Sequence, residues 1–345
     1  MNRKKIYIQA AEQISMQQPL SEEWMTAPAA YEEPLVKAVN PVFRDYLPAN
    51  EARRMGNIMK RALVTALKVL ADTGTEHPDA IVTGTSLGCL DYTERFLDAM
   101  VENGEQTLSP TFFMQSTHNT VGSALGIYTK THGYNVTYSH GCVSFELSLL
   151  DAWMQLQTGN AQTTLVGGHD EMVESYFDLL RKTGYVGQPG MVPCSEVAMS
   201  MLLTTGSGKD RLCELAGIRL CNSPTMTDIQ ALTDEMLAEA GMERAAVSAV
   251  MTGINGHPDN DQCYREVADA LFPDVPLLRY KHLFGENHTV SALGTYAAAQ
   301  LLKQNSIPTF MYDERRPQRC DSLSGLLLIN QMKGREYAFT LLRRP

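Results

Sequence analysis

Strand-like and helix-like apolar patterns alternate along this chain, and the alternation restarts after about 200 residues. In the first part, strand patterns lie at residues 5–11, 80–86, 134–139 and 163–168, and helix patterns at 55–71 and 144–159. In the second part, strand patterns lie at residues 212–220 and 245–253, and helix patterns at 228–241 and 290–304. Such alternation is typical of α/β proteins. We therefore predict an internally duplicated α/β fold whose two halves are residues 1–206 and 207–345.

Composition and charge exclude several classes of protein. Of the 345 residues, 44% are apolar and 20% are charged, which is ordinary for a soluble globular protein. No run reaches the roughly 18 apolar residues that a membrane span needs, and the basic start lacks the apolar core of a secretion signal. The formal net charge of −10 argues against nucleic-acid binding. We expect a cytoplasmic protein that acts neither on nucleic acid nor at a membrane.

The seven cysteines are scattered without a CxxC pair, so the sequence indicates neither a disulfide framework nor a zinc site. Cys142 differs from the others in its position. Before it, Val136 and Tyr138 alternate with polar residues, as on a strand; after it, Phe145 and Leu149 recur at helical spacing. Cys142 is therefore predicted to lie at a strand-to-helix turn.

A cysteine at such a turn has a chemical use. The first amides of a helix are unpaired and its dipole is positive there, so we expect the pKa of the Cys142 thiol to be lowered. The same amides can stabilise the oxyanion that forms when a thiolate attacks a carbonyl group. Position alone leaves a second interpretation open, in which Cys142 is a small buried apolar residue.

Several segments resemble, in the same order, the β-ketoacyl synthases of the thiolase superfamily. In that family the nucleophilic cysteine opens a central helix, and a strand that ends in Gly-Gly follows. Here the series reads TYSHGC, VSFELSLLDAWMQLQTGNAQ and TTLVGGHDE, and the segments RRMGNIMKRAL, IVTGTSLGCLDYTERF, SPTFFMQSTHNTVGSALG and SEVAMSMLL are also similar. The resemblance covers most of residues 1–300. It implies a thiolase-like, layered αβαβα fold with Cys142 as the nucleophile.

The second half resembles the part of the family that carries the base chemistry. The segment KHLFGENHTVSALG places His288 at the second active-site histidine and Lys281 at its supporting lysine. Two additional residues, Glu286 and Asn287, lie between Gly285 and His288 and bear on that geometry. The alternative for His288 is a core histidine that caps the helix of residues 289–303.

Two departures from the family concern the same active site. The segment GINGHPDND has Gly253 where the family has its first histidine, and His257 is four residues further on. His257 is a candidate replacement on that loop, and the alternative is a solvated loop histidine. The family's C-terminal Gly-Phe-Gly-Gly loop is replaced by LLLINQMKGREY, in which Asn330 or Gln331 is a candidate for lining the pocket.

The resemblance implies a decarboxylative Claisen condensation. Cys142 would accept an acyl group from an acyl-carrier-protein thioester, and His288 would stabilise the enolate left when malonyl-carrier loses CO₂. No cofactor of its own is implied, because the phosphopantetheine arrives on the acyl carrier protein. The resemblance also implies a homodimer, or a heterodimer with another ketosynthase, and is greatest to the compact synthases and chain-length-factor-like proteins of aryl-polyene pathways.

Two alternatives remain beside the synthase. The first is a non-catalytic partner similar to the chain-length factors that pair with an active synthase; the missing histidine and the missing Gly-Phe-Gly-Gly loop favour it. Retention of Cys142 together with His288 favours catalysis, because a scaffold needs neither. The second alternative is a divergent cysteine hydrolase, which would lack the Gly-Gly strand and the HTVSALG segment.

Overall fold

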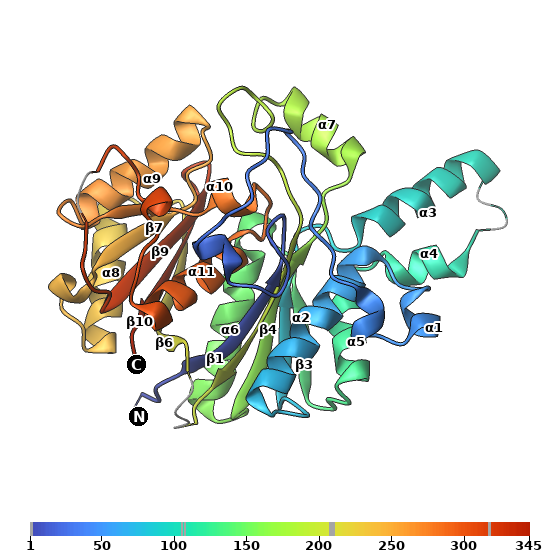
Figure 1. The fold of residues 1–345 in the computed structure, drawn as a ribbon, viewed down its shortest axis with the longest axis horizontal. Helices are drawn as coiled ribbons and strands as arrows, with labels where there is room; N and C mark the ends of the chain where they lie inside the picture. Colours follow the sequence, from blue (N-terminus) through green and yellow to red (C-terminus); the bar gives the residue numbers. More distant parts are fainter. Residues whose placement is uncertain (1–2, 105, 107, 207–210, 317–318) are drawn as a thin grey trace.

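The computed structural model describes residues 3–104, 106, 108–206, 211–316 and 319–345. The main elements of the first half are β1 (Tyr7–Ile14), α1 (Ala49–Ala52), α2 (Asn57–Thr73), β2 (Ala80–Gly84), α3 (Leu90–Asn103), α4 (Pro110–Gln115), α5 (Thr120–Tyr128), β3 (Tyr134–Tyr138), α6 (Ser144–Thr158), β4 (Thr163–Asp170), α7 (Glu174–Lys182) and β5 (Val197–Thr204). Those of the second half are β6 (Cys213–Asn222), α8 (Met226–Ala240), β7 (Ala249–Thr252), α9 (Pro258–Leu271), β8 (Leu277–Arg279), α10 (Lys281–Phe284), α11 (Ser291–Gln304), β9 (Gly325–Met332) and β10 (Glu336–Arg343). The predicted α/β alternation is confirmed (Figure 1).

The strands of the described residues form one mixed sheet in the order β3-β2-β4-β5-β1-β6-β10-β9-β7-β8. Read outward from the centre, the first half runs β1, β5, β4, β2, β3, and the second half repeats that order with β6, β10, β9, β7, β8. The halves meet where β1 pairs antiparallel with β6, through Tyr7 opposite Glu214 and Ile8 opposite Cys213. The boundary that we predict near residue 206 falls in the connection from β5 to β6, part of which lies outside the described residues.

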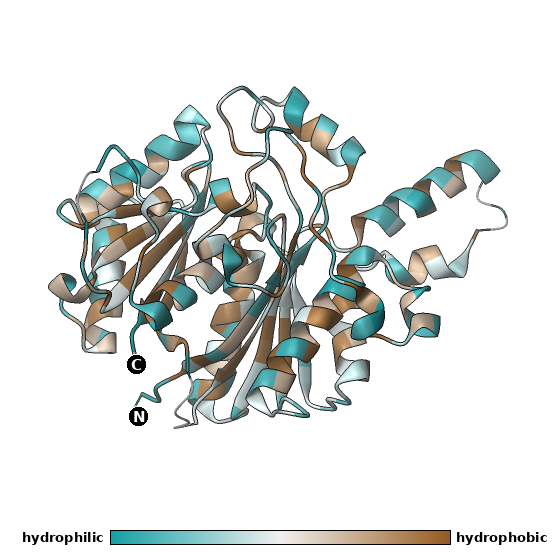
Figure 2. Ribbon diagram, viewed as in Figure 1, coloured by the Kyte–Doolittle hydropathy of each residue, from teal (hydrophilic) through white to brown (hydrophobic). Residues whose placement is uncertain are grey.

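Two helices, α6 and α11, lie between the two halves of the sheet. Helix α6 contacts β2 and β4 of the first half and β6 of the second, while α11 contacts strands of both halves and α6 itself. Residues 291–302 of α11 are all buried, as expected of a helix without a polar face. Helices α2 and α5 cover the outer face of the first half, and α8 and α9 that of the second (Figure 1). Figure 2 shows the apolar residues concentrated on the strands and on the helix faces that meet them.

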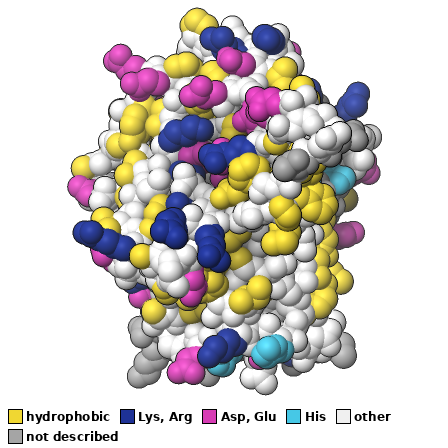
Figure 3. Space-filling model, turned by 90° about the vertical axis from the view of Figure 1, so that its right-hand side faces the viewer, with side chains coloured by type: hydrophobic (Ala, Val, Ile, Leu, Met, Phe, Trp, Pro, Cys, Tyr) yellow, Lys and Arg dark blue, Asp and Glu magenta, His cyan; other side chains and the backbone are white. Residues whose placement is uncertain are grey.

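Helices α3 and α4 form an arm that projects from the first half (Figure 1). Apolar side chains of this arm and of α5 are exposed; they are Leu97, Val101, Phe113, Met114 and Ile127. Figure 3 shows apolar side chains gathered on this side of the molecule. In the described part of the chain, no helix is both long and apolar enough to cross a bilayer.

Candidate active site

Cys142 lies on a 3₁₀ turn, η3 (Gly141–Val143), between β3 and α6, which confirms the predicted strand-to-helix position. Gly141 has a φ of 53°, in the left-handed region that glycine adopts without strain. The Ser144 hydroxyl fixes the turn, since it accepts from the backbone N–H of His140 and donates to the carbonyl oxygen of Gly141, both at 2.8 Å. The position of the thiol is therefore set by backbone and side-chain bonds together.

Cys142, Lys281 and His288, from the two halves of the chain, line one pocket. Asn330 and Gln331 of β9 line it as well, as their place in the sequence suggested. Its open volume is about 40 Å³. A water molecule needs roughly 10–15 Å³, so the pocket holds a few waters and no acyl chain until side chains move. The remaining lining residues are Met172, Leu180, Tyr185, Val186, Cys194, Glu286, Asn287 and Met332.

The thiol of Cys142 is held in its protonated form by its surroundings. Burial and the nearby carboxylates of Glu146 and Glu336 raise the pKa of the thiol, and Lys281 opposes them only in part. The prediction of a lowered pKa is wrong, because Cys142 is only 7% exposed and burial disfavours the charged thiolate. Cys142 Sγ lies 3.4 Å from Glu336 Oε2 and is placed to donate a hydrogen bond to it.

Glu146, one turn along α6 from Cys142, is a second buried acid at this site. Burial raises the pKa of the Glu146 carboxyl group to about 7, although hydrogen bonds to the carboxylate, one of them from Asn330 Nδ2 at 2.8 Å, oppose the rise. The same Asn330 Nδ2 lies 2.9 Å from the carbonyl oxygen of Cys142. Asn330 therefore ties the Cys142 turn and the buried acid to β9.

His288 is a pocket residue and not a helix cap. Its Nε2 lies 2.7 Å from the hydroxyl oxygen of Tyr176 on α7. Helix α11 begins at Ser291 with Val290 as its N-cap, and no side chain caps it. The alternative of a capping core histidine is therefore wrong, and His288 presents a polar group to the pocket that contains Cys142.

Lys281 has a different partner from the one that the resemblance implies. Its Nζ lies 2.9 Å and 2.8 Å from the two carboxylate oxygens of Glu286, and both side chains are buried. Glu286 is one of the two residues inserted before His288. Among the described residues, no hydrogen bond joins Lys281 to His288, so the expected support of His288 by Lys281 is not what the structure contains.

The space for the missing histidine is filled. A Cβ atom on Gly253 would lie 2.5 Å from Tyr264 Oη and 2.8 Å from Lys281 Cε, well inside normal contact distances. His257 does not replace the histidine. It caps α9, where its Nδ1 accepts from the backbone N–H of Asn260 at 3.4 Å, and it lines a neighbouring groove of about 410 Å³. The proposed catalytic role of His257 is therefore corrected: the structure does not bring it to Cys142.

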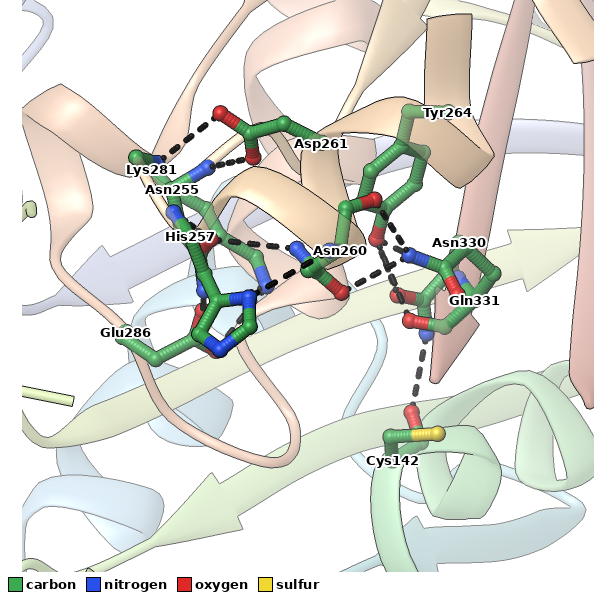
Figure 4. A network of polar contacts seen from close by, with 11 residues as sticks. Cys142, Asn255, His257, Asn260, Asp261, Tyr264, Lys281, Glu286, Asn330 and Gln331 are labelled. Carbon is green, nitrogen blue, oxygen red and sulfur yellow. Dashed lines mark hydrogen bonds and ion pairs between the residues drawn. The ribbon is translucent and has the colours of Figure 1, made fainter. Parts of the chain in front are cut away.

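A network of polar contacts connects Lys281 with the Cys142 turn (Figure 4). Glu286 Oε2 accepts from Asn255 Nδ2 at 2.6 Å, and Asn255 Oδ1 accepts from Asn260 Nδ2 at 3.1 Å. Asn260 in turn accepts from Gln331 Nε2 at 2.8 Å, which brings the network to β9 beside Asn330. The network therefore holds Asn255 and Asn260 between the buried Lys281–Glu286 pair and β9.

Comparison with known proteins establishes the family of this chain. The family described as "Beta-ketoacyl synthase, N-terminal domain" matches residues 22–251, which is well over half of the chain. The chain belongs to the β-ketoacyl synthase family. The 3-oxoacyl-[acyl-carrier-protein] synthase 2 of Vibrio harveyi is 25% identical over 133 residues, a match that covers 37% of this chain and 32% of that protein. The alignment thus spans about a third of the length of this curated relative.

Solved structures with the family's thiolase-like fold superpose on the whole chain. The ishigamide ketosynthase/chain length factor gives a TM-score of 0.83 at 16% identity, with 99% of this chain and 100% of that chain covered. A ketosynthase in complex with its chain length factor from Xenorhabdus doucetiae gives 0.76 at 17% identity, with 99% and 98% covered. At these identities the likeness establishes the fold, which confirms the thiolase-like prediction.

Several residues of the site were not found from the sequence, among them Glu146, Tyr176, Tyr264 and Glu336. Tyr176 and Tyr264 lie on helices, and nothing in the neighbouring sequence indicates that their hydroxyl groups make polar contacts in the site. Glu336 lies in the segment that replaces the family's C-terminal loop, and the Lys333-Gly334 pair before it is a usable sign of a tight hairpin. This pair predicts the position of the turn but not the residues that the turn contacts.

Proposed function

We propose that this protein is a 3-oxoacyl-acyl-carrier-protein synthase that acts on Cys142-bound acyl chains in fatty-acid, polyketide or aryl-polyene biosynthesis. The observation that carries the proposal is that Cys142, from the first half, and His288, from the second half, line the same pocket. Acyl transfer needs the thiol, and decarboxylation of a malonyl thioester needs a donor for the developing enolate.

Cys142 and His288 would each serve one of the two steps, acyl transfer and decarboxylation. Cys142 would take the acyl group, and the neighbouring backbone of η3 and α6 offers N–H groups to the oxyanion. His288 would hold the enolate oxygen, with its ring orientation set by the hydrogen bond to Tyr176. Without the family's first histidine the site has one imidazole for this task, and Tyr264 and Lys281 fill the vacated region. We expect condensation to be slow, because each oxyanion donor contributes about 10²–10³ in rate.

An acyl carrier protein is the proposed partner, and its phosphopantetheine arm is the group that must reach Cys142. The groove lined by His257 and Lys333 borders the pocket, and Tyr185 lines both. We expect the arm to lie in this groove and to reach the thiol when Tyr185 and the flexible side chains of Met172 and Met332 move. No cofactor belonging to the protein itself is part of the proposal.

Intact-mass measurement tests the proposal directly. The protein is incubated with hexanoyl-carrier thioester and then with malonyl-carrier, and both proteins are weighed. The expected result is a hexanoyl adduct on wild type, none on Cys142→Ser, and transfer of a chain two carbons longer to the carrier. If the wild-type protein never acquires the adduct, the proposed synthase function is wrong.

A second candidate function is a chain-length-factor-like partner of an active ketosynthase. It is favoured by the filled space at Gly253 and by a pocket that has room for only a few waters. In that case the protein would bind a catalytic ketosynthase and change its product length without being acylated. A product-length assay with and without the Cys142→Ser variant separates the two functions, because a partner subunit would work equally well without its thiol.

A further inference from the structure

The thiol of Cys142 is the first member of a chain of three polar side chains that leads to solvent. Its Sγ lies 3.4 Å from Glu336 Oε2, and the other oxygen of that carboxylate, Oε1, lies 3.3 Å from His140 Nε2. Cys142 is 7% exposed, whereas the side chains of Glu336 and His140 are 31% and 63% exposed. The buried thiol thus contacts a half-buried carboxylate, which in turn contacts an exposed imidazole.

The backbone fixes the carboxylate in this place. Strands β9 and β10 are joined by a tight turn in which Lys333 and Gly334 have φ values of 52° and 64°. Glu336 is the first residue of β10, where it pairs with Met332 on one side and Asn222 on the other. Both β9 and β10 contact η3. The carboxylate therefore approaches Cys142 from a ladder position of the sheet, which is a rigid support for a reacting group.

We propose that Glu336 is a catalytic residue that accepts the thiol proton and returns it to the leaving group. This proposal rests on the proposed acyl transfer to Cys142. As the S–H proton moves to Glu336 Oε2, the sulfur attacks the thioester carbonyl and the new S–C bond forms. The bond from the carbonyl carbon to the pantetheine sulfur then breaks. The departing sulfur takes the proton from Glu336, so a neutral thiol leaves and the carboxylate is restored.

The surroundings of the thiol explain why an acceptor is needed. The thiolate is the nucleophilic form, and burial together with two carboxylates raises the pKa of the Cys142 thiol. Glu336 is the carboxylate within hydrogen-bond distance of Sγ in the described part of the chain. His140 is a positioning residue, since it touches the carboxylate and not the sulfur. The charged or titratable groups around the thiol and its carboxylate include Glu146 of α6, Lys281 of α10, Glu336 of β10 and His140 of the turn before η3. They also include Tyr185, Tyr280 and His288.

The test compares two reactions of Cys142 in the full-length protein between pH 6 and pH 9. The first is acylation by the hexanoyl thioester of pantetheine, followed by intact mass; the second is alkylation by iodoacetamide, followed by peptide mass. Iodide leaves without a proton, so alkylation depends on loss of the thiol proton but not on its return to a leaving group. Glu336→Gln removes the acceptor, Glu336→Asp keeps a carboxylate, and Glu235→Gln on the exposed face of α8 is the charge-matched control.

The two reactions should respond to different extents. Acylation of Glu336→Gln should be about 10²-fold slower than wild type at pH 7 and should rise with pH, while wild type and Glu235→Gln change little across the range. Alkylation of Glu336→Gln should slow by a clearly smaller factor, because it loses only the acceptor of the thiol proton, whereas acylation also loses the donor to the leaving group. Glu336→Asp should acylate at an intermediate rate.

Three results would overturn the assignment. If Glu336→Gln is acylated as fast as wild type or faster, Glu336 only lowers the reactivity of the thiol. The proposed synthase function does not depend on Glu336 in that case. If acylation and alkylation both slow by the same factor, Glu336 does not return the proton to the leaving group, and the proposed double role is wrong. If wild type is alkylated at Cys142 yet never acylated, the proposed function fails and the role of Glu336 fails with it.

Discussion

The hydroxyl group of Tyr264 lies where a side chain at residue 253 would begin, 2.5 Å from the Cβ position of Gly253. Tyr264 is fully buried on α9, and its hydroxyl accepts from the backbone N–H of Gln331 at 3.2 Å. The glycine, the tyrosine and the lysine beside them fit one another. Restoring a histidine at residue 253 would therefore require the site around it to be rebuilt.

Adding even one carbon at residue 253 should destabilise the protein. We expect Gly253→Ala to lower the free energy of unfolding by about 1–3 kcal/mol, as overpacking does. In a Tyr264→Phe background, which removes the closest atom, the loss should be smaller by more than about 0.5 kcal/mol. Urea denaturation of the four proteins of this cycle measures the coupling. Additive effects would mean that the backbone moves away from the contact.

The Lys281–Glu286 pair should behave as a buried ion pair. Lys281→Met leaves the Glu286 carboxylate buried without its cation, and we expect a loss of about 3–5 kcal/mol in the free energy of unfolding. The double variant Lys281→Met/Glu286→Gln should recover most of that loss. The matched control is Lys303→Met, which breaks the exposed contact of Lys303 with Glu22 and should change stability by less than about 0.5 kcal/mol. A loss as small as that of the control would contradict the pairing.

Glu146 should make stability depend on pH. Its pKa is raised from 4.5 to about 7 in the folded protein, so the folded state binds the proton more tightly and this stabilisation is lost as pH rises through that window. Between pH 5 and pH 8, the free energy of unfolding of wild type should fall by roughly 2–3 kcal/mol relative to that of Glu146→Gln, because the variant has no charge to bury. Denaturant unfolding at the two pH values gives the difference. A constant gap between the two proteins would show that Glu146 is ionised throughout.

His288 should matter for decarboxylation and not for acyl transfer. We expect His288→Ala to reduce CO₂ release from malonyl-carrier by more than about tenfold and to leave hexanoylation of Cys142 unchanged. Tyr176→Phe should have a smaller effect in the same direction, because it only orients the ring. His132→Ala, on the exposed surface, is the control. Equal decarboxylation by His288→Ala and wild type would remove His288 from the reaction.

The apolar side chains of the arm and of α5 should be covered by a second subunit. We expect sedimentation to give a dimer whose interface exceeds about 1,200 Å². Val101, which is 85% exposed, and Met114 are suitable probes. Val101→Asp and Met114→Asp should shift the protein toward monomer, whereas Leu179→Asp on α7 should not. A wild-type monomer at micromolar concentration would leave a heterodimer as the surviving form.

Local patterns predicted those parts of the fold that depend on neighbouring residues. The change of period around Cys142 located its turn, and the helix at residues 144–159 matches α6 within a residue. The strand expected at 245–253 is shorter, because residues 244–246 form a 3₁₀ turn and only Ala249–Thr252 pair in the sheet. Glu336 is 194 residues from Cys142, and their contact depends on how the last hairpin docks on η3. No local pattern encodes such a contact.

The repeated strand order places two turns of this site at matching positions in the chain. Strands β3 and β8 are the outermost strands of their halves, and each leads directly into the candidate site: β3 to the turn that carries Cys142, and β8 to Lys281. One repeat thus supplies the thiol and its counterpart supplies the lysine from the same topological point. Neither repeat alone contains all the side chains of the candidate site, so the contact between the repeats is as much a part of that site as the residues themselves.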